Sequence, residues 1–323
     1  MHRIEAIDIE KAFGIVLMIM GHQFYGDSFD KLIHGFHMPM FFIISGFLYR
    51  SKNDFVMFLK RKAQTLIVPY FFFAILHLLI FFVMRGCSIS ESLDRLYHFF
   101  LFNHEKLPIC GAIWFLSSLF FAEIIYYWLD KLNCWLKMIC VICLASAGFA
   151  LSYCSVRLPY CIDVSFVGVG LLWIGECLNK LFVKKENLIK LSGKAKVWMG
   201  FLGALIASFL IFVNAGVNLR LATYGLPLLF LFNATLMTVS LFFIASIFPK
   251  DKFYFRELTF IGQNSIVYLG LNQFVLMFLK KINLNDGVYN FICKLISLIV
   301  CLLILHLFAN GLSKTSLRTF IGK

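Results

Sequence analysis

The chain has 323 residues, of which 61% are hydrophobic and 15% are charged, and its formal net charge is +13. Soluble domains average about half apolar and a quarter charged residues, so this composition excludes a soluble globular protein and indicates a multi-pass membrane protein. The basic residues lie in short connections between apolar runs, where they set membrane topology, so the positive charge does not indicate nucleic-acid binding.

Ten apolar runs predict ten transmembrane helices packed as an all-α bundle. Because the connections between them are short, we expect residues 1–323 to form a single integral membrane domain. In chain order the predicted spans are residues 9–24, 35–49, 66–84, 112–129, 135–153, 164–182, 197–213, 224–248, 260–279 and 289–309.

Lys and Arg residues are distributed unevenly between the two sides of this arrangement. With the N-terminus inside, 21 of them fall on the inner side and 8 on the outer side, while Lys294 lies within the last span. Positive residues accumulate on the cytoplasmic side of membrane proteins, so both termini are predicted to be cytoplasmic.

The outer connection of residues 85–111 carries apolar residues at helical spacing beside charged ones. This pattern predicts a short helix lying at the membrane surface. Cys87 and Cys110 bracket the connection on the oxidising side, where they either form a disulfide or remain two unpaired cysteines.

The first predicted span carries Lys11 and His22, which lie eleven residues apart. Eleven residues make about three helical turns and about 16 Å, so the two side chains share one face. A helix facing lipid excludes such residues, which therefore face the protein interior. His22 is a candidate general base or acyl carrier, or else a packing histidine held by hydrogen bonds. Lys11 is a candidate phosphate ligand, or else a topogenic charge.

The second predicted span begins with His37 and Pro39 and carries Ser45-Gly46 two turns later. His37 is a candidate for holding or deprotonating an acceptor, although it could equally serve loop packing. With His34 it forms an HxxH pattern, but the segment supplies no further ligands, so no metal site is expected. Ser45-Gly46 is also a usual close-packing pair in membrane helices.

Glu123 and Glu176 are carboxylates inside predicted spans, where an unpaired charge is costly. Each is therefore expected to meet a cation or a hydroxyl group in the interior of the bundle. Glu123 is the better candidate for an active site.

These motifs carry a family resemblance. A lysine separated by ten residues from a histidine in the first span, followed by HMPMFF (residues 37–42) and Ser45-Gly46, resembles the motifs of membrane acyltransferase family 3, which includes sugar O-acetylases. Trp114-Phe115-Leu116 and residues 261–265 (IGQNS) resemble later motifs of the family. Where the family often has a histidine, this chain has Leu271-Asn272-Gln273.

The resemblance implies roles for named residues. Lys11 would bind acyl-CoA, acetyl-CoA above all, as a co-substrate rather than a bound cofactor, together with Lys60, Arg61 and Lys62, which alone would equally suit topogenic anchoring. His22, with Lys11 and His37, would form the catalytic group. Acceptor binding or support of the oxyanion would fall to Ser45, Trp114, Glu123, Asn264 and Asn272.

The sequence thus predicts a membrane O-acyltransferase of a bacterial-type inner membrane. It would move an acyl group from cytosolic acyl-CoA to a hydroxyl of a saccharide or glycolipid on the outer side, directly or through an acyl-enzyme. The alternative is a secondary transporter or flippase for a glycan intermediate, because ten spans with intramembrane charges also describe transporters. Against it, the predicted spans show no pair of similar halves with corresponding broken segments.

The charge asymmetry predicts that a protease-sensitive tag placed after Lys323 is shielded in intact cells. The measurement is digestion by external protease before and after the membrane is permeabilised. Digestion of the tag from outside would contradict the predicted topology and separate Lys11 from the cytosol.

Overall fold

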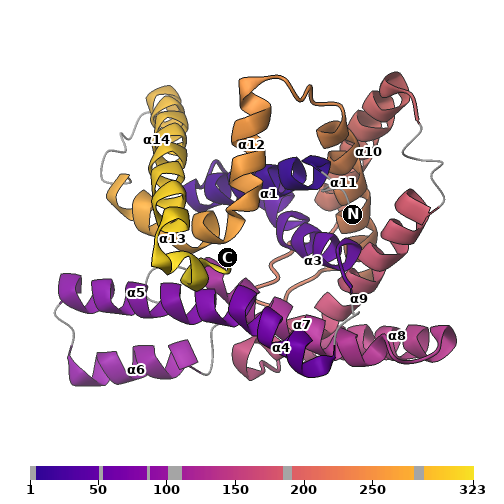
Figure 1. Cartoon of the computed structure of the whole chain (residues 1–323), viewed down its shortest axis with the longest axis horizontal. Helices are drawn as coiled ribbons and strands as arrows, with labels where there is room; N and C mark the ends of the chain where they lie inside the picture. The colour runs from indigo at the N-terminus through magenta and orange to yellow at the C-terminus, as the bar shows by residue number, and fades with distance from the viewer. Residues whose placement is uncertain (1–4, 51–53, 86–87, 101–110, 185–190, 280–286) are drawn as a thin grey trace.

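The structure is a computed structural model, and it describes all residues except 1–4, 51–53, 86–87, 101–110, 185–190 and 280–286 (Figure 1). The described residues are mainly helical, which confirms the all-α prediction. The helices are α1 (Glu5–Gln23), α2 (Asp27–His34), α3 (His37–Phe47), α4 (Phe55–Lys62), α5 (Val68–Arg85), α6 (Ile89–Phe100), α7 (Trp114–Leu129), α8 (Cys134–Tyr153), α9 (Ile162–Asn179), α10 (Gly193–Val213), α11 (Pro227–Ser246), α12 (Phe253–Gln263), α13 (Ser265–Leu279) and α14 (Gly287–Lys314).

Local sequence sets where several of these helices begin. Asp54 accepts a hydrogen bond from the Val56 backbone N–H at 3.1 Å and caps α4. Asn133 caps α8 and Ser192 caps α10 in the same way. Each side chain satisfies a backbone donor that the first helical turn leaves without a partner.

Seven helical segments in the described ranges are long and apolar enough to cross a membrane. They are Phe55–Met84, Gly111–Leu129, Cys134–Tyr153, Pro159–Phe182, Gly193–Val213, Pro227–Ser246 and Asn290–Lys314. The first is continuous because a π-helical turn, Ala63–Ile67, joins α4 to α5. The chain is therefore a multi-pass membrane protein. The predicted count of ten spans is not confirmed, because seven segments in the described ranges are long and apolar enough.

The other three predicted spans correspond to α1, α3 and α13, and each departs from a regular span for its own reason. The helix α1 has 19 residues but carries acidic residues in its first turns, followed by Lys11. The helix α3 has only 11 residues. The helix α13 has 15 residues because the chain breaks helical geometry at Asn264. The sequence pattern merged α13 with the end of α12.

The helix α1 lies inside the bundle, in contact with α3, α11, α12 and α13 (Figure 1). Its residues Ile9, Ala12, Ile15 and Ile19 are fully buried. Asp8 and Glu10 are also buried, whereas Lys11 and His22, which were predicted to face protein, are half-buried. Surrounding helices thus keep α1 away from lipid.

Close approach of α3 and α9 fixes the middle of the bundle. A Cβ atom on Gly46 would collide with the backbone carbonyl of Leu172, and one on Gly175 would collide with that of Ile43. Glycine therefore allows the two backbones to touch, as small residues do in membrane helix pairs. The Asn179 amide also donates a hydrogen bond to the Phe47 carbonyl at 2.8 Å.

Peripheral helices present apolar side chains outward. Exposed residues on α8, α10 and α14 include Trp135, Ile139, Ile142, Trp198, Phe201, Leu205, Phe209, Ile299, Leu303 and Leu307. An exposed apolar surface of this extent requires an apolar solvent. These helices are the ones that face the acyl chains of a bilayer.

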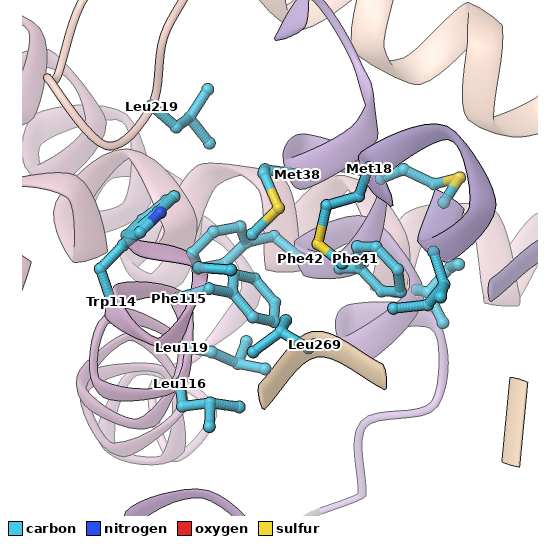
Figure 2. Packing of buried hydrophobic residues seen from close by; sticks show 14 of the residues in the cluster. Met18, Met38, Phe41, Phe42, Trp114, Phe115, Leu116, Leu119, Leu219 and Leu269 are labelled. Atoms are coloured by element: carbon cyan, nitrogen blue, oxygen red, sulfur yellow. The ribbon is translucent and has the colours of Figure 1, made fainter. Parts of the chain in front are cut away.

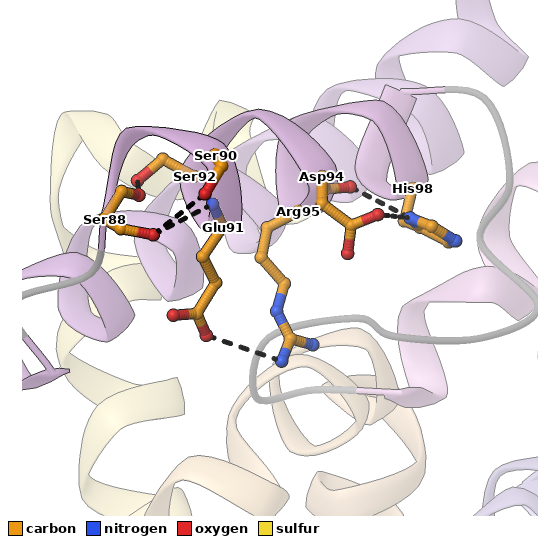
Figure 3. A network of polar contacts seen from close by, with 7 residues as sticks. All are labelled: Ser88, Ser90, Glu91, Ser92, Asp94, Arg95 and His98. Carbon is orange, nitrogen blue, oxygen red and sulfur yellow. Dashed lines mark hydrogen bonds and ion pairs between the residues drawn. The ribbon is translucent and has the colours of Figure 1, made fainter.

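The predicted short helix in the outer connection is present as α6. Its polar residues pair along one helix, where Glu91 meets Arg95 at 3.9 Å and Asp94 meets His98 at 3.3 Å (Figure 3). The Arg95 guanidinium also lies 5.2 Å from the centre of the Phe81 ring, so α6 packs against α5. Cys87 and Cys110 lie outside the described residues.

The contact between α3 and α9 predicts a large effect of Gly175→Val. The added side chain must push against backbone, and overpacking of this kind costs about 1–3 kcal/mol or more. We expect a clearly lower melting temperature of the purified protein in detergent. Gly311→Ala is the matched control, because a Cβ there meets nothing within 4 Å. Equal melting temperatures for Gly175→Val and the wild type would contradict this packing.

Candidate active site

Two cavities of about 220 Å³ each lie along α1, one at Lys11 and one at His22. The histidine cavity is lined by Met18, His22, His34, His37, Met38, Gly111, Ala112, Trp114, Asn218, Leu219, Arg220 and Gln273. The lysine cavity is lined by Lys11, Ile15, Phe41, Ile44, Ser45, Leu48, Lys62, Leu66, Phe115, Leu116, Leu119, Glu123, Ser265, Ile266 and Leu269. The shared face predicted for Lys11 and His22 thus serves two separate cavities.

An apolar wall, formed by Met18, Met38, Phe41 and Phe115, separates the two cavities. Met18 and Met38 line the histidine cavity, and the two phenylalanines line the lysine cavity. Figure 2 shows these four side chains between Leu219, on the side of the histidine cavity, and the lysine-cavity end of α7. The two phenylalanine rings lie 5.8 Å apart.

The wall is about one helical turn thick. On α3, Met38 and Phe41 are three residues apart, and on α13 the lining residues Leu269 and Gln273 are four apart. At a rise of 1.5 Å per residue, these spacings correspond to about 5 Å. Groups held in the two cavities are therefore about 5 Å apart along the helix axes, a distance that a few methylene groups span.

In the histidine cavity, His22 is held by Gln273 of α13. The Gln273 amide nitrogen lies 3.0 Å from Nδ1 and 3.2 Å from Nε2 of His22. The backbone N–H of Gly111 donates a hydrogen bond to the Gln273 Oε1 atom at 2.5 Å, which turns the amide N–H groups toward the imidazole. An N–H group can donate only to a ring nitrogen that carries a lone pair, so this arrangement suits a neutral His22.

The second feature of this cavity is a histidine pair, His34 and His37, whose rings meet edge to face at 5.3 Å. The Nδ1 atom of His37 donates to the Ile33 carbonyl at 2.7 Å, since a carbonyl oxygen can only accept. This bond leaves Nε2 of His37 as the ring's acceptor. His34 is turned toward Asp30, whose carboxylate lies 3.3 Å away.

Trp114 and Arg220 supply N–H donors to the same cavity. Trp114 comes from the start of α7, as predicted for an acceptor-binding residue, and is buried. Arg220 comes from the connection between α10 and α11, which Asn214 braces by accepting hydrogen bonds from the Ala215 and Leu226 N–H groups. The Arg220 guanidinium lies so close to Gly111 that a Cβ there would collide with it.

In the lysine cavity, Lys62 and Glu123 form an ion pair with 2.7 Å between Nζ and Oε1. Glu176, the second carboxylate predicted to meet a cation or hydroxyl group, pairs with Lys137 at 2.5 Å and with Lys180 at 2.6 Å. The expectation that both glutamates meet cations is confirmed. Ser45 also lines the lysine cavity, so it lies with Lys11 and Lys62 rather than with His22.

Four residues predicted for the site line neither cavity. Lys60 and Arg61 are exposed beyond Lys62. Asn272 is fully buried, and its amide donates to the Tyr268 and Leu269 carbonyls of its own helix. Asn264 sits at the break before α13, where its Oδ1 atom accepts a hydrogen bond from Lys323 at 2.5 Å. Its neighbour Ser265 does line the lysine cavity.

Sequence reasoning did not select Gln273, Arg220 or Lys323. Gln273 could have been found, because it is a polar residue inside an apolar run beside the chosen Asn272. Arg220 lies in the connection between α10 and α11, and Lys323 follows the short helix Ser316–Ile321, so sequence periodicity describes the position of neither. Within the part of the chain that the structure describes, no cluster of three or more His, Cys, Asp or Glu side chains could hold a metal ion.

Comparison with protein families gives a match over almost the whole bundle. A model described as an acyltransferase domain, that of acyltransferase family 3, matches residues 4–315, a range that includes the lining residues of both cavities. A comparison with curated proteins finds no match.

The contact between Gln273 and His22 predicts a biased tautomer of His22. The shorter distance, to Nδ1, favours the form with a proton on Nε2, and loss of one hydrogen bond worth about 1 kcal/mol in Gln273→Leu should change the tautomer ratio roughly fivefold. The measurement is the ¹⁵N chemical shifts of the ring in histidine-labelled protein, with His22→Ala identifying the signal. Identical ring shifts in Gln273→Leu and the wild type would remove Gln273 from this role.

Proposed function

Because the chain belongs to acyltransferase family 3, we propose that it transfers an acyl group, an acetyl group above all, from acyl-CoA to a hydroxyl group of a saccharide or glycolipid. The observation that carries this proposal is the pair of cavities on one helix, with cations in one and an imidazole in the other. A donor with anionic phosphates suits the first, and a neutral hydroxyl acceptor suits the second.

The lysine cavity is the proposed donor site. Lys11 and Lys62 line it, and Lys60 and Arg61 lie exposed one turn or less from Lys62. This set of cations can attract the phosphates of coenzyme A while the slim pantetheine arm enters the cavity. The thioester then reaches the apolar wall, one helical turn from the histidine cavity.

The histidine cavity is the proposed acceptor site and holds the catalytic base. As the acceptor oxygen attacks the thioester carbonyl carbon, its hydroxyl group displaces the Gln273 N–H from Nδ1 of His22, and Nδ1 takes the hydroxyl proton. The carbon–sulfur bond then breaks, and the protonated His22 returns the proton to the coenzyme A thiolate. N–H groups of Trp114 and Arg220 are the donors available to stabilise the negative charge on the carbonyl oxygen. The Nε2 atom of His37 accepts a hydrogen bond from the acceptor substrate and so holds it in place.

In the membrane, α1, α3 and α13 would complete a bundle of ten passes with the seven longer segments. Their short or charged helices are tolerated because other helices cover them. Both termini would then face the cytoplasm of a bacterial-type inner membrane, with Lys11 toward the cytosolic donor and His22 toward the outer acceptor.

The proposed function predicts that purified protein releases free coenzyme A thiol from acetyl-CoA when saccharide acceptors are present. His22→Ala should lower turnover by roughly 10²- to 10⁴-fold, the range of general acid–base assistance, with the Kd for coenzyme A nearly unchanged. His98→Ala on α6 is the matched control, since His98 lines neither cavity, and it should keep wild-type turnover.

Wild-type turnover in His22→Ala would remove the catalytic assignment. A transporter or flippase is tested in cells by deletion of the gene, which should abolish acylation of the exported glycan while its amount stays near normal. Loss of export with intact acylation of the remaining glycan would overturn the transferase and favour transport.

A further inference from the structure

Glu123 has one carboxylate oxygen without a partner in a buried position. The side chain comes from α7, lines the lysine cavity and is only 2% exposed. Its Oε1 atom accepts a hydrogen bond from Lys62 at 2.7 Å. Its Oε2 atom accepts none from the residues that the structure describes.

A buried carboxylate oxygen with no hydrogen bond is unfavourable, and the penalty is larger for a charged group than for a neutral one. Lys62 donates to one oxygen of the Glu123 carboxylate, and the second oxygen is a hydrogen-bond acceptor. The geometry therefore calls for a ligand with an N–H or O–H group inside the lysine cavity.

We propose that Glu123 accepts a hydrogen bond from an amide N–H of the pantetheine arm of acyl-CoA and so positions the thioester at the apolar wall. This inference rests on the proposed function. Most of the cavity lining is apolar, with Ile15, Phe41 and Leu119 among its members, which suits the methylene groups between the amides. The Oε2 atom of Glu123 then accepts the hydrogen bond that the pantetheine arm donates.

The spacing along α7 selects which amide is involved. Phe115 at the wall and Glu123 are eight residues apart, which is about 12 Å along the helix. The two side chains lean the same way along the helix, so they keep this separation. The pantetheine amide nitrogen farther from sulfur is seven bonds away, or about 9 Å in an extended chain, and a hydrogen bond of about 3 Å to the Glu123 carboxylate spans the rest. That N–H, rather than the nearer one, meets Glu123 when the sulfur lies at the wall.

The test compares coenzyme A with an analogue in which an ester oxygen replaces the farther amide N–H. Wild-type protein should bind this analogue about 10- to 100-fold more weakly, as expected for loss of a hydrogen bond to a charged group. An analogue with the same replacement at the nearer amide should bind within about twofold of coenzyme A. The Glu123→Ala variant should bind coenzyme A and the analogue with the ester at the farther amide equally well.

Two further variants make the outcome independent of folding defects. The double variant Lys62→Met, Glu123→Met removes both charges together and avoids an unpaired buried cation, and it should also lose the discrimination. Glu257→Gln, which alters a glutamate paired with His306 outside both cavities, should keep the full wild-type ratio.

The result separates this inference from the function on which it rests. If wild-type protein binds coenzyme A but does not discriminate against the ester analogue, Glu123 does not hold the arm and the inference is overturned. The same holds if discrimination persists in both Glu123 variants. If wild-type protein binds none of these ligands, the proposed acyl-CoA donor itself is wrong.

Discussion

The fold depends on covering one polar helix with protein. Asp8, Glu10, Lys11 and His22 all lie on α1, and each would be costly against lipid. The helices α2, α3, α11, α12, α13 and α14 contact α1 and shield it. The helix α12 comes so close that a Cβ on Gly262 would collide with the carbonyl of Asp8. Exposed apolar residues lie on the outer helices α8, α10 and α14.

Short helices around α1 create the two cavities. The helix α3 begins at His37 and α7 follows the turn at Gly111, so both starts lie beside His22 and leave room there. The helix α13 begins at Ser265 beside the lysine cavity. Irregular backbone inside a membrane protein is tolerated where it lines a polar cavity, because water or a ligand can satisfy its polar groups. The helices that fall short of a full span, α1, α3 and α13, thus build the candidate site together with α7 and the segment Phe55–Met84.

The sequence predicted the helical class, the interior position of α1 and the shared face of Lys11 and His22, because all three follow from local composition and helical spacing. It did not predict that Gln273 holds His22, since the two residues are 251 positions apart and meet only through packing. Glu123 was selected as an intramembrane carboxylate, but its partner Lys62 lies on a different helix, and local sequence does not show that the two form an ion pair. The bounds of the predicted span 260–279 missed the break at Asn264, where the polar residues Gln263, Asn264 and Ser265 interrupt the apolar run.

The composition of the wall bears on how a transferase of this kind would avoid hydrolysing its donor. Water competes with any hydroxyl acceptor for a thioester, and a cavity of about 220 Å³ can hold several water molecules. Met18, Met38, Phe41 and Phe115 offer water no hydrogen bonds, so under the proposed function an acyl group that crossed between them would shed its water before it met His22. Methionine side chains are flexible enough to move aside for a slim acyl chain and to close behind it. Under the proposed function, these four residues thus separate the donor from the acceptor at rest and move aside to let the acyl group reach the acceptor.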